Sequence, residues 1–127
     1  MPINSLTMSD PIATINLSLE QSLANLDHGY EMLLSIAEDM IEDLPILVEE
    51  IRKAIDGKDS ESAVLMSFTI KGLASNFQVQ SLMNLAAKME SEYSILSDLE
   101  KARLARQIAI ESERTIFALR QEFGISE

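Results

Sequence analysis

The feature that most constrains the fold of this chain is a long row of apolar residues between positions 30 and 55. They recur every three or four residues over about seven turns, which is the spacing of one face of an α-helix. Such a helix buries its apolar face only by packing against other helices or a sheet. The row consists of Tyr30, Leu33, Leu34, Ala37, Met40, Ile41, Leu44, Leu47, Val48, Ile51 and Ile55.

The rest of the chain has the same helical period. Pro45 interrupts the first row and has no backbone N–H, so we expect a kink or a short break there. Asp59 suits the N-cap of a third helix from residue 60 to about 77, a fourth helix runs from about 80 to 93, and Ser97 with Glu100 forms a capping box before the last. The inward residues expected on these helices are Ala63, Met66, Ile70, Leu73, Ala74, Phe77, Leu82, Leu85, Ala86, Met89, Ala102, Ala105, Ile108, Ala109, Ile116, Leu119 and Phe123.

The N-terminal part differs from this pattern. Residues 1–15 are polar and aperiodic, which favours a flexible arm, and Ser18 with Gln21 predicts a short helix ending near Leu26. No alternating apolar run or Asn-Gly hairpin signal occurs anywhere in the sequence. We therefore predict an all-α protein, with residues 16–127 forming an antiparallel four-helix bundle that carries a short additional N-terminal helix.

Composition narrows the function classes. The net charge of −11, from 21 acidic and 10 basic residues, disfavours nucleic acid and anionic membrane surfaces as partners. The absence of cysteine removes disulfides and thiolate metal sites. No apolar run reaches the roughly 20 residues that span a bilayer, and no secretory signal pattern is present. These properties indicate a soluble cytoplasmic protein.

One stretch, SFTIKGLASNF at residues 67–77, breaks the amphipathic pattern. At 100° per residue, the core-facing residues of this helix leave Phe68 on the opposite side, beside apolar residues, a lysine and a glycine. An exposed Phe is common on protein surfaces, and the N-terminal arm or short helix covering it would make it ordinary core. The alternative is a partner-binding surface, here named the Phe68 patch, formed by Val64, Leu65, Phe68, Lys71, Gly72 and Ser75.

The same stretch resembles the phosphoacceptor segment of histidine-containing phosphotransfer (HPt) domains, which typically reads His-Ser/Thr-Leu-Lys-Gly, then small residues and Asn-Phe/Leu-Gly. LDHGYEMLLSIAEDMIEDLPILVEEIRKAI resembles the second helix of that family, including its proline, and LAAKME resembles the closing helix segment. The resemblance extends over roughly residues 17 to 123. It implies an antiparallel four-helix bundle of a phosphorelay pathway.

Two positions depart from the family pattern. Phe68 stands where these domains carry the phosphorylated histidine, and a phenyl ring has no nucleophilic atom, so phosphotransfer at this position is excluded. Gln78 stands where the family usually has glycine. Lys71 and Gly72 match the pattern, in which the lysine lies near the phosphoryl group and the glycine admits the receiver domain. A lysine on a helix exterior is otherwise often only a solvated charge.

No other residue supplies a catalytic centre. His28 is the single histidine and lies in a predicted turn, where we expect it to be exposed to solvent. Asp39, Glu42 and Asp43 share a helix face that is expected to be solvated, although carboxylates in this spacing bind a hard cation weakly. We therefore predict no enzyme activity, no cofactor and no metal.

The sequence leads to one main hypothesis and two alternatives. The main hypothesis is a phosphorylation-incompetent HPt-like protein (a pseudo-HPt), a monomer that binds a response-regulator receiver domain or a histidine kinase through the Phe68 patch, as adaptor or competitor. The first alternative is a structural or oligomerisation bundle outside phosphorelay, with a homodimer formed through the Phe68 face. The second is an engineered His-to-Phe form of an active phosphotransfer protein.

Overall fold

The computed structural model of the chain describes residues 29–126, which are almost entirely helical. The predicted arm at residues 1–15, the short helix at residues 18–26 and His28 lie outside this range. The elements in chain order are α3 (Gly29–Asp56), α4 (Ser60–Ser75), α5 (Gln80–Glu92), the 3₁₀ turn η2 (Tyr93–Ile95) and α6 (Asp98–Phe123).

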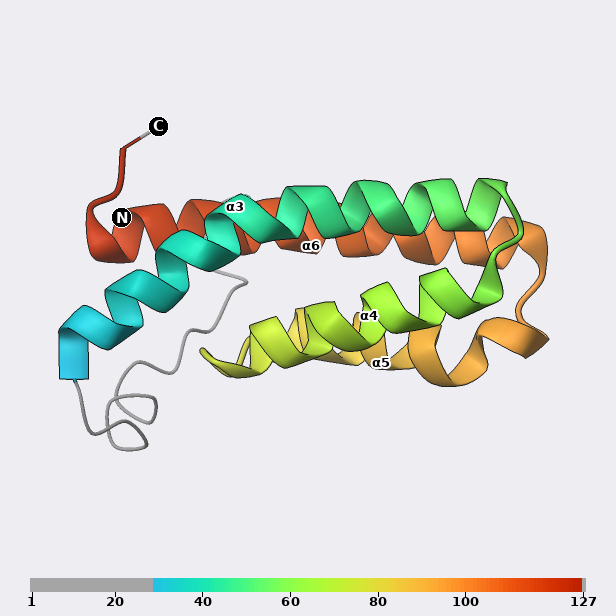
Figure 1. The fold of residues 1–127 in the computed structure, drawn as a ribbon, viewed down its shortest axis with the longest axis horizontal. Coiled ribbons are helices and arrows are strands. Elements are labelled where there is room, and N and C mark those ends of the chain that lie inside the picture. The colour runs from blue at the N-terminus through green and yellow to red at the C-terminus, as the bar shows by residue number, and fades with distance from the viewer. Residues whose placement is uncertain (1–28, 127) are drawn as a thin grey trace, which may run out of the picture.

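The helices form an antiparallel bundle because short loops join consecutive elements. Figure 1 shows α3 and α6 running alongside one another, with α4 and α5 forming the other half of the bundle. Each half packs on the other, since α3 contacts both α4 and α6 while α5 contacts both α4 and α6. The predicted all-α fold class is confirmed.

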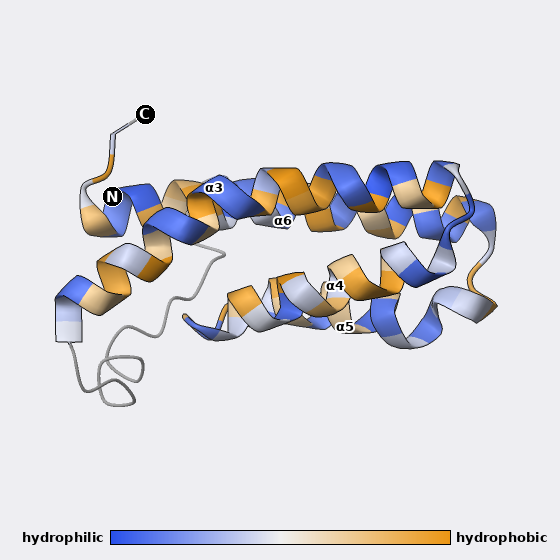
Figure 2. Cartoon of the chain, in the orientation of Figure 1, coloured by the Kyte–Doolittle hydropathy of each residue, from blue (hydrophilic) through white to orange (hydrophobic). Residues whose placement is uncertain are grey.

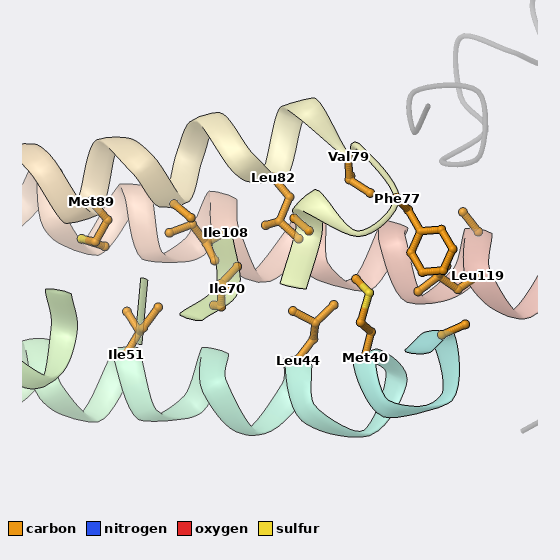
Figure 3. Packing of buried hydrophobic residues seen from close by; sticks show 14 of the residues in the cluster. Met40, Leu44, Ile51, Ile70, Phe77, Val79, Leu82, Met89, Ile108 and Leu119 are labelled. Carbon is orange, nitrogen blue, oxygen red and sulfur yellow. The ribbon is translucent and has the colours of Figure 1, made fainter. Parts of the chain in front are cut away.

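The core runs the whole length of the bundle and is filled by side chains from all four helices (Figure 3). At one end the ring of Phe77 meets that of Phe123 edge to face, with 5.7 Å between the centroids. Met40 and Leu119 lie beside Phe77, while Ile51 and Met89 lie toward the other end. Because the core is continuous, it holds α4 firmly between α3 and α5.

The proline in α3 bends the helix without breaking it. Backbone helix geometry continues through Pro45, and Figure 1 shows α3 changing direction along its length. Pro45 cannot donate to the carbonyl of Ile41, which is the bond that an ordinary residue would make. The expected kink is thus consistent with the structure, whereas the expected short break is absent.

The α4–α5 turn begins earlier than predicted. α4 ends at Ser75, and Phe77 is buried from the turn and not from the helix. Gln78 has φ of 56°, a left-handed conformation that glycine adopts at no steric cost. Its side-chain Nε2 donates to the carbonyl of Ser75 at 3.0 Å, which holds the turn in place of that glycine. α5 likewise ends one residue early, because Tyr93 begins η2.

The inward face of α6 was predicted only in part. Ala102 is exposed, and Ala105, Ala109 and Ile116 are half-buried. The face that is buried instead includes polar residues. Thr115 can be buried there because its hydroxyl donates to the Glu111 carbonyl at 2.7 Å and needs no partner outside the helix. The buried residues of α6 are Leu104, Ile108, Ser112, Thr115, Ala118, Leu119 and Phe123.

A similar correction applies to α4, while the caps are as predicted. Ser67 is buried with its hydroxyl donating to the Ala63 carbonyl, and the expected core residues Met66 and Leu73 are only half-buried. Asp59 accepts from the Ser62 N–H at 3.1 Å, as an N-cap should. Ser97 and Glu100 form both hydrogen bonds of a capping box.

Candidate docking surface on α4

The outer side of α4 exposes two large apolar side chains in adjacent turns. Phe68 and Leu65 are each 54% exposed, although the inner side of the same helix is buried in the core. Figure 2 shows hydrophobic colour along much of α4. The prediction that Phe68 faces outward is confirmed.

Val64 and Ser75, two further members of the Phe68 patch, are less exposed than Leu65 and Phe68. Val64 is half-buried and packs against the core, so it forms the inner edge of the patch and not part of its exposed centre. Ser75 is half-buried, and its hydroxyl donates to the Gly72 carbonyl at 2.6 Å. The patch therefore has Leu65 and Phe68 at its centre.

Gly72 is exposed and has no steric reason to be glycine within the described bundle. A methyl group built at this position would meet no atom within 4 Å, and φ lies outside the left-handed region. Glycine inside a helix costs about 1 kcal/mol relative to alanine. The residue leaves the backbone of α4 open to close approach, one turn after Phe68.

Lys71 is not a free charge. Its Nζ lies 2.5 Å from Glu90 Oε1 on α5 and 5.3 Å from the centre of the Phe68 ring. The two charged side chains are 34% and 26% exposed, so solvent screens the pair only partly. Lys71 thus joins α4 to α5 and lies against the aromatic ring, which the alternative of a merely solvated lysine does not describe.

Glu90 belongs to this surface, and sequence reasoning missed it. It lies 19 residues from Lys71 and ends the LAAKME segment that resembles the closing helix of the family, but that resemblance named no partner for it. A helical period places Glu90 on a face of α5 but does not say which residue of α4 it meets. Only the packing of the two helices provides that pairing.

The exposed side chains at the centre of the patch, Leu65 and Phe68, carry no nucleophilic atom. The phenyl ring of Phe68 has no lone pair, and the Ser75 hydroxyl already donates to a backbone carbonyl. Within residues 29–126 no three His, Asp or Glu side chains lie together as metal ligands would, and the acidic face with Asp39, Glu42 and Asp43 is no exception. Across the same range, no helix has the length and apolarity needed to cross a membrane.

A comparison of the sequence with known protein families identifies the family of this chain. The sequence profile of the Hpt domain matches residues 35–123, which is more than half of the chain and includes all of α4, α5 and α6. The chain belongs to the Hpt domain family. Hpt domains are phosphotransfer modules, not catalysts, and they interact with receiver domains or kinases in phosphorelay signalling. No curated protein and no solved structure matches the chain.

Membership in the Hpt domain family assigns the protein to phosphorelay-related signalling. The entire Phe68 patch falls inside the matched region, as does Glu90. The match begins within α3, so the first 34 residues lie outside the matched region.

Proposed function

We propose that this protein is an Hpt domain that does not carry phosphate and that binds a receiver domain or a histidine kinase through the Phe68 patch. The observation that carries the proposal is the exposed phenyl ring of Phe68 at the centre of α4, where the resemblance places the phosphoacceptor histidine. A ring without a nucleophilic atom accepts no phosphoryl group, but it remains available for contact.

The ring contributes to docking through the apolar area that a partner covers. A Phe side chain has about 150–250 Å² of surface, and somewhat more than half of it is exposed here. Covering about 100 Å² at about 25 cal/mol per Å² contributes ~2.5 kcal/mol, before any gain from Leu65. Gly72 assists by letting the partner come close to the helix backbone.

The proposed mechanism is occupancy. A receiver domain held on this patch finds no imidazole and therefore neither gives nor receives a phosphoryl group there. While bound, it is withheld from active phosphotransfer partners, so the protein acts as a competitor or as an adaptor in the cytoplasm. Neither role requires a cofactor or a metal.

Calorimetric titration with the receiver domains and kinases of the same organism tests the proposal. We expect at least one of them to bind, and Phe68→Asp to weaken binding about 30-fold or more, since 2 kcal/mol corresponds to that factor. Phe117→Asp is the matched control, because Phe117 is also an exposed aromatic residue (42%) but lies on α6. Absence of binding by every candidate, or equal loss in both variants, would refute the proposal.

The exposed pair of Leu65 and Phe68 also fits the alternative of a homodimer. Light scattering over a range of concentrations distinguishes the two functions. A mass that doubles with concentration in the native protein and stays monomeric in Phe68→Asp would replace the adaptor with a self-associating bundle. A monomer throughout the range leaves the patch free for a signalling partner.

A further inference from the structure

The outer side of α6 exposes large apolar side chains, as the outer side of α4 does. Leu99, Ile110 and Phe117 are all exposed there, at spacings of eleven and seven residues. Both spacings are close to whole numbers of helical turns, so the three side chains lie on one side of the helix. We call this side the α6 outer face. Its residues recur every three or four positions, as in a helix that contacts another helix, and are Leu99, Arg103, Arg106, Ile110, Glu113, Phe117 and Arg120.

The α6 outer face points away from the Phe68 patch. α6 packs against α3 and α5, and α4 packs against the same two helices, so α4 and α6 lie diagonally across the bundle (Figure 1). The outer sides of two diagonal helices face in opposite directions. A partner on the α6 outer face therefore leaves the Phe68 patch uncovered.

Two opposite charges on this face are uncompensated within residues 29–126. Arg106 and Glu113 are both exposed, and neither forms an ion pair in this part of the chain. They lie seven residues apart, roughly 10 Å along the helix axis, and so do not meet each other. Glu49 and Asp56 of the neighbouring α3 do not compensate Arg106, because both are paired with Arg52.

A second copy of the same helix supplies the matching charges when it runs antiparallel to the first. A two-fold axis that passes between Ala109 and Ile110 brings Arg106 of each copy against Glu113 of the other. Two ion pairs then form by symmetry. A parallel pair of helices would instead place Arg106 against Arg106 and Glu113 against Glu113, and repulsion between like charges disfavours that arrangement. The charge pattern of the face is thus complementary to itself in one orientation.

The same alignment covers the exposed apolar side chains. Ile110 lies beside the axis and meets Ile110 of the second copy. Arg103 comes level with Phe117 of the second copy, where a guanidinium over the ring is a favourable cation–π contact. Leu99 comes level with Arg120 of the second copy, whose aliphatic part is able to cover it. One alignment therefore satisfies both the charged and the apolar residues of the face.

We propose that two copies of this protein associate through the α6 outer face, as a two-fold dimer in which the α6 helices are antiparallel. This dimer replaces the monomer predicted from the sequence and uses a different face from the Phe68 patch. Each copy keeps its own patch, so the dimer presents two patches that face away from each other. The inference does not rest on receiver binding. Because one helix of each copy makes the contact, the interface is small and we expect a reversible dimer.

Sedimentation velocity between about 1 µM and about 1 mM tests the dimer. We expect the mass of the native protein to double over this range. Arg106→Glu should raise the dissociation constant about tenfold or more, because it sets two pairs of like charges against each other. The double variant Arg106→Glu/Glu113→Arg should restore the dimer, since exchanging the two charges recreates both ion pairs. Lys53→Glu makes the same change of charge on the exposed side of α3 and, as the control, should leave the dissociation constant unchanged.

Single cysteines test the orientation, since the protein has none of its own. Ile110→Cys lies beside the proposed axis and should form a disulfide between two copies under mild oxidation. Leu99→Cys is equally exposed to oxidant but should not link to itself, because the two copies of this position lie about 30 Å apart along antiparallel helices. Linkage of Leu99→Cys to itself without linkage of Ile110→Cys would show a parallel pair and overturn the inference.

Three further results would also overturn it. The first is a native protein that stays monomeric up to about 1 mM. The second is a double variant that dimerises no better than Arg106→Glu. The third is a dimer that is lost in Phe68→Asp and kept in Arg106→Glu, which would assign self-association to the Phe68 patch.

Receiver titration keeps this inference separate from the proposed function. Phe117→Asp should weaken the dimer and leave receiver binding unchanged, because each copy carries its own Phe68 patch. Receiver binding by a protein that never dimerises would overturn the dimer alone. A dimer with the expected response to Arg106→Glu that binds no receiver or kinase would support the dimer and refute the proposed function. Circular dichroism of each variant checks that the fold is kept.

Discussion

Replacing Gly72 by alanine should make the protein more stable and a poorer binding partner at the same time. The added methyl group meets no atom within 4 Å and so neither clashes nor buries area. What remains is the intrinsic helix propensity, which favours alanine by about 0.8–1.0 kcal/mol. If a partner approaches the backbone of α4 at this point, the same methyl group separates the two surfaces and weakens the complex.

The matched control is the same substitution at Gly124. A methyl group built there also meets nothing within 4 Å, but the backbone has φ of 63°. Since left-handed geometry costs L-residues about 1–2 kcal/mol, Gly124→Ala should destabilise the protein. The two variants make identical chemical changes in equally open surroundings, so the opposite signs would isolate backbone conformation as the cause.

Urea unfolding followed by circular dichroism measures both effects. We expect Gly72→Ala to raise the midpoint by about 0.5 M, given slopes of roughly 2 kcal/mol/M for small domains, and the melting temperature by about 4 °C. A loss of stability in Gly72→Ala would refute the reasoning, because it would show that the fold itself requires glycine there. Suppose that a receiver binds the native protein and no longer binds Phe68→Asp. If Gly72→Ala binds that receiver with unchanged affinity, the glycine does not serve close approach of the partner.

Three further variants test the local structure. Gln78→Gly should raise the free energy of unfolding by less than the roughly 1–2 kcal/mol that a left-handed conformation costs an L-residue, because loss of the hydrogen bond to the Ser75 carbonyl offsets part of the gain; an unchanged urea midpoint would contradict this. Ser97→Ala should lower it by about 1 kcal/mol through loss of the capping box before α6, with Ser94→Ala as a control outside the cap. The pKa of Asp59 is lowered by hydrogen bonds from the side chain and backbone N–H of Ser62, so the unfolded state binds more protons and stability falls as the pH drops below about 4. Asp59→Asn should therefore make acid unfolding, followed by circular dichroism from pH 6 to pH 2, less steep; an unchanged profile would rule out this contribution.

The features that the sequence predicted well are those decided by neighbouring residues. The N-cap at Asp59 and the capping box at Ser97 depend on residues three positions apart, and the outward direction of Phe68 depends on the helical period alone. Each of these interactions closes within one or two turns. Knowledge of the rest of the fold is not needed to predict them.

The features that the sequence did not predict depend on distant or polar partners. The ion pair between Lys71 and Glu90 joins two helices, and only their packing brings the two residues together. Ser112 and Thr115 were excluded from the α6 core because they are polar, although a short hydroxyl side chain is small enough to bury. The predicted inward face of α6 was therefore made up of apolar residues alone and included Ala102, which is exposed.

Residue type also does not identify which residue after α3 adopts the left-handed conformation. Gly57 directly follows the helix and suits such a position, but the left-handed residue is Lys58, with φ of 56°. Glycine permits this conformation without requiring it. The hydrogen bond from the Asp59 N–H to the Ala54 carbonyl, at 2.7 Å, fixes the turn so that Lys58, and not Gly57, is left-handed.

The contact of Lys71 with both Glu90 and the Phe68 ring determines how the α4 surface responds to salt and to phosphate. Its positive charge is already compensated inside the molecule, so a surface that covers Phe68 meets no unpaired cation at Lys71. Contact of that kind depends on shape and apolar area, and added salt weakens it little. A phosphoryl group brought to Lys71 would compete with Glu90 for that cation, so the proposed docking predicts tighter binding of the unphosphorylated partner.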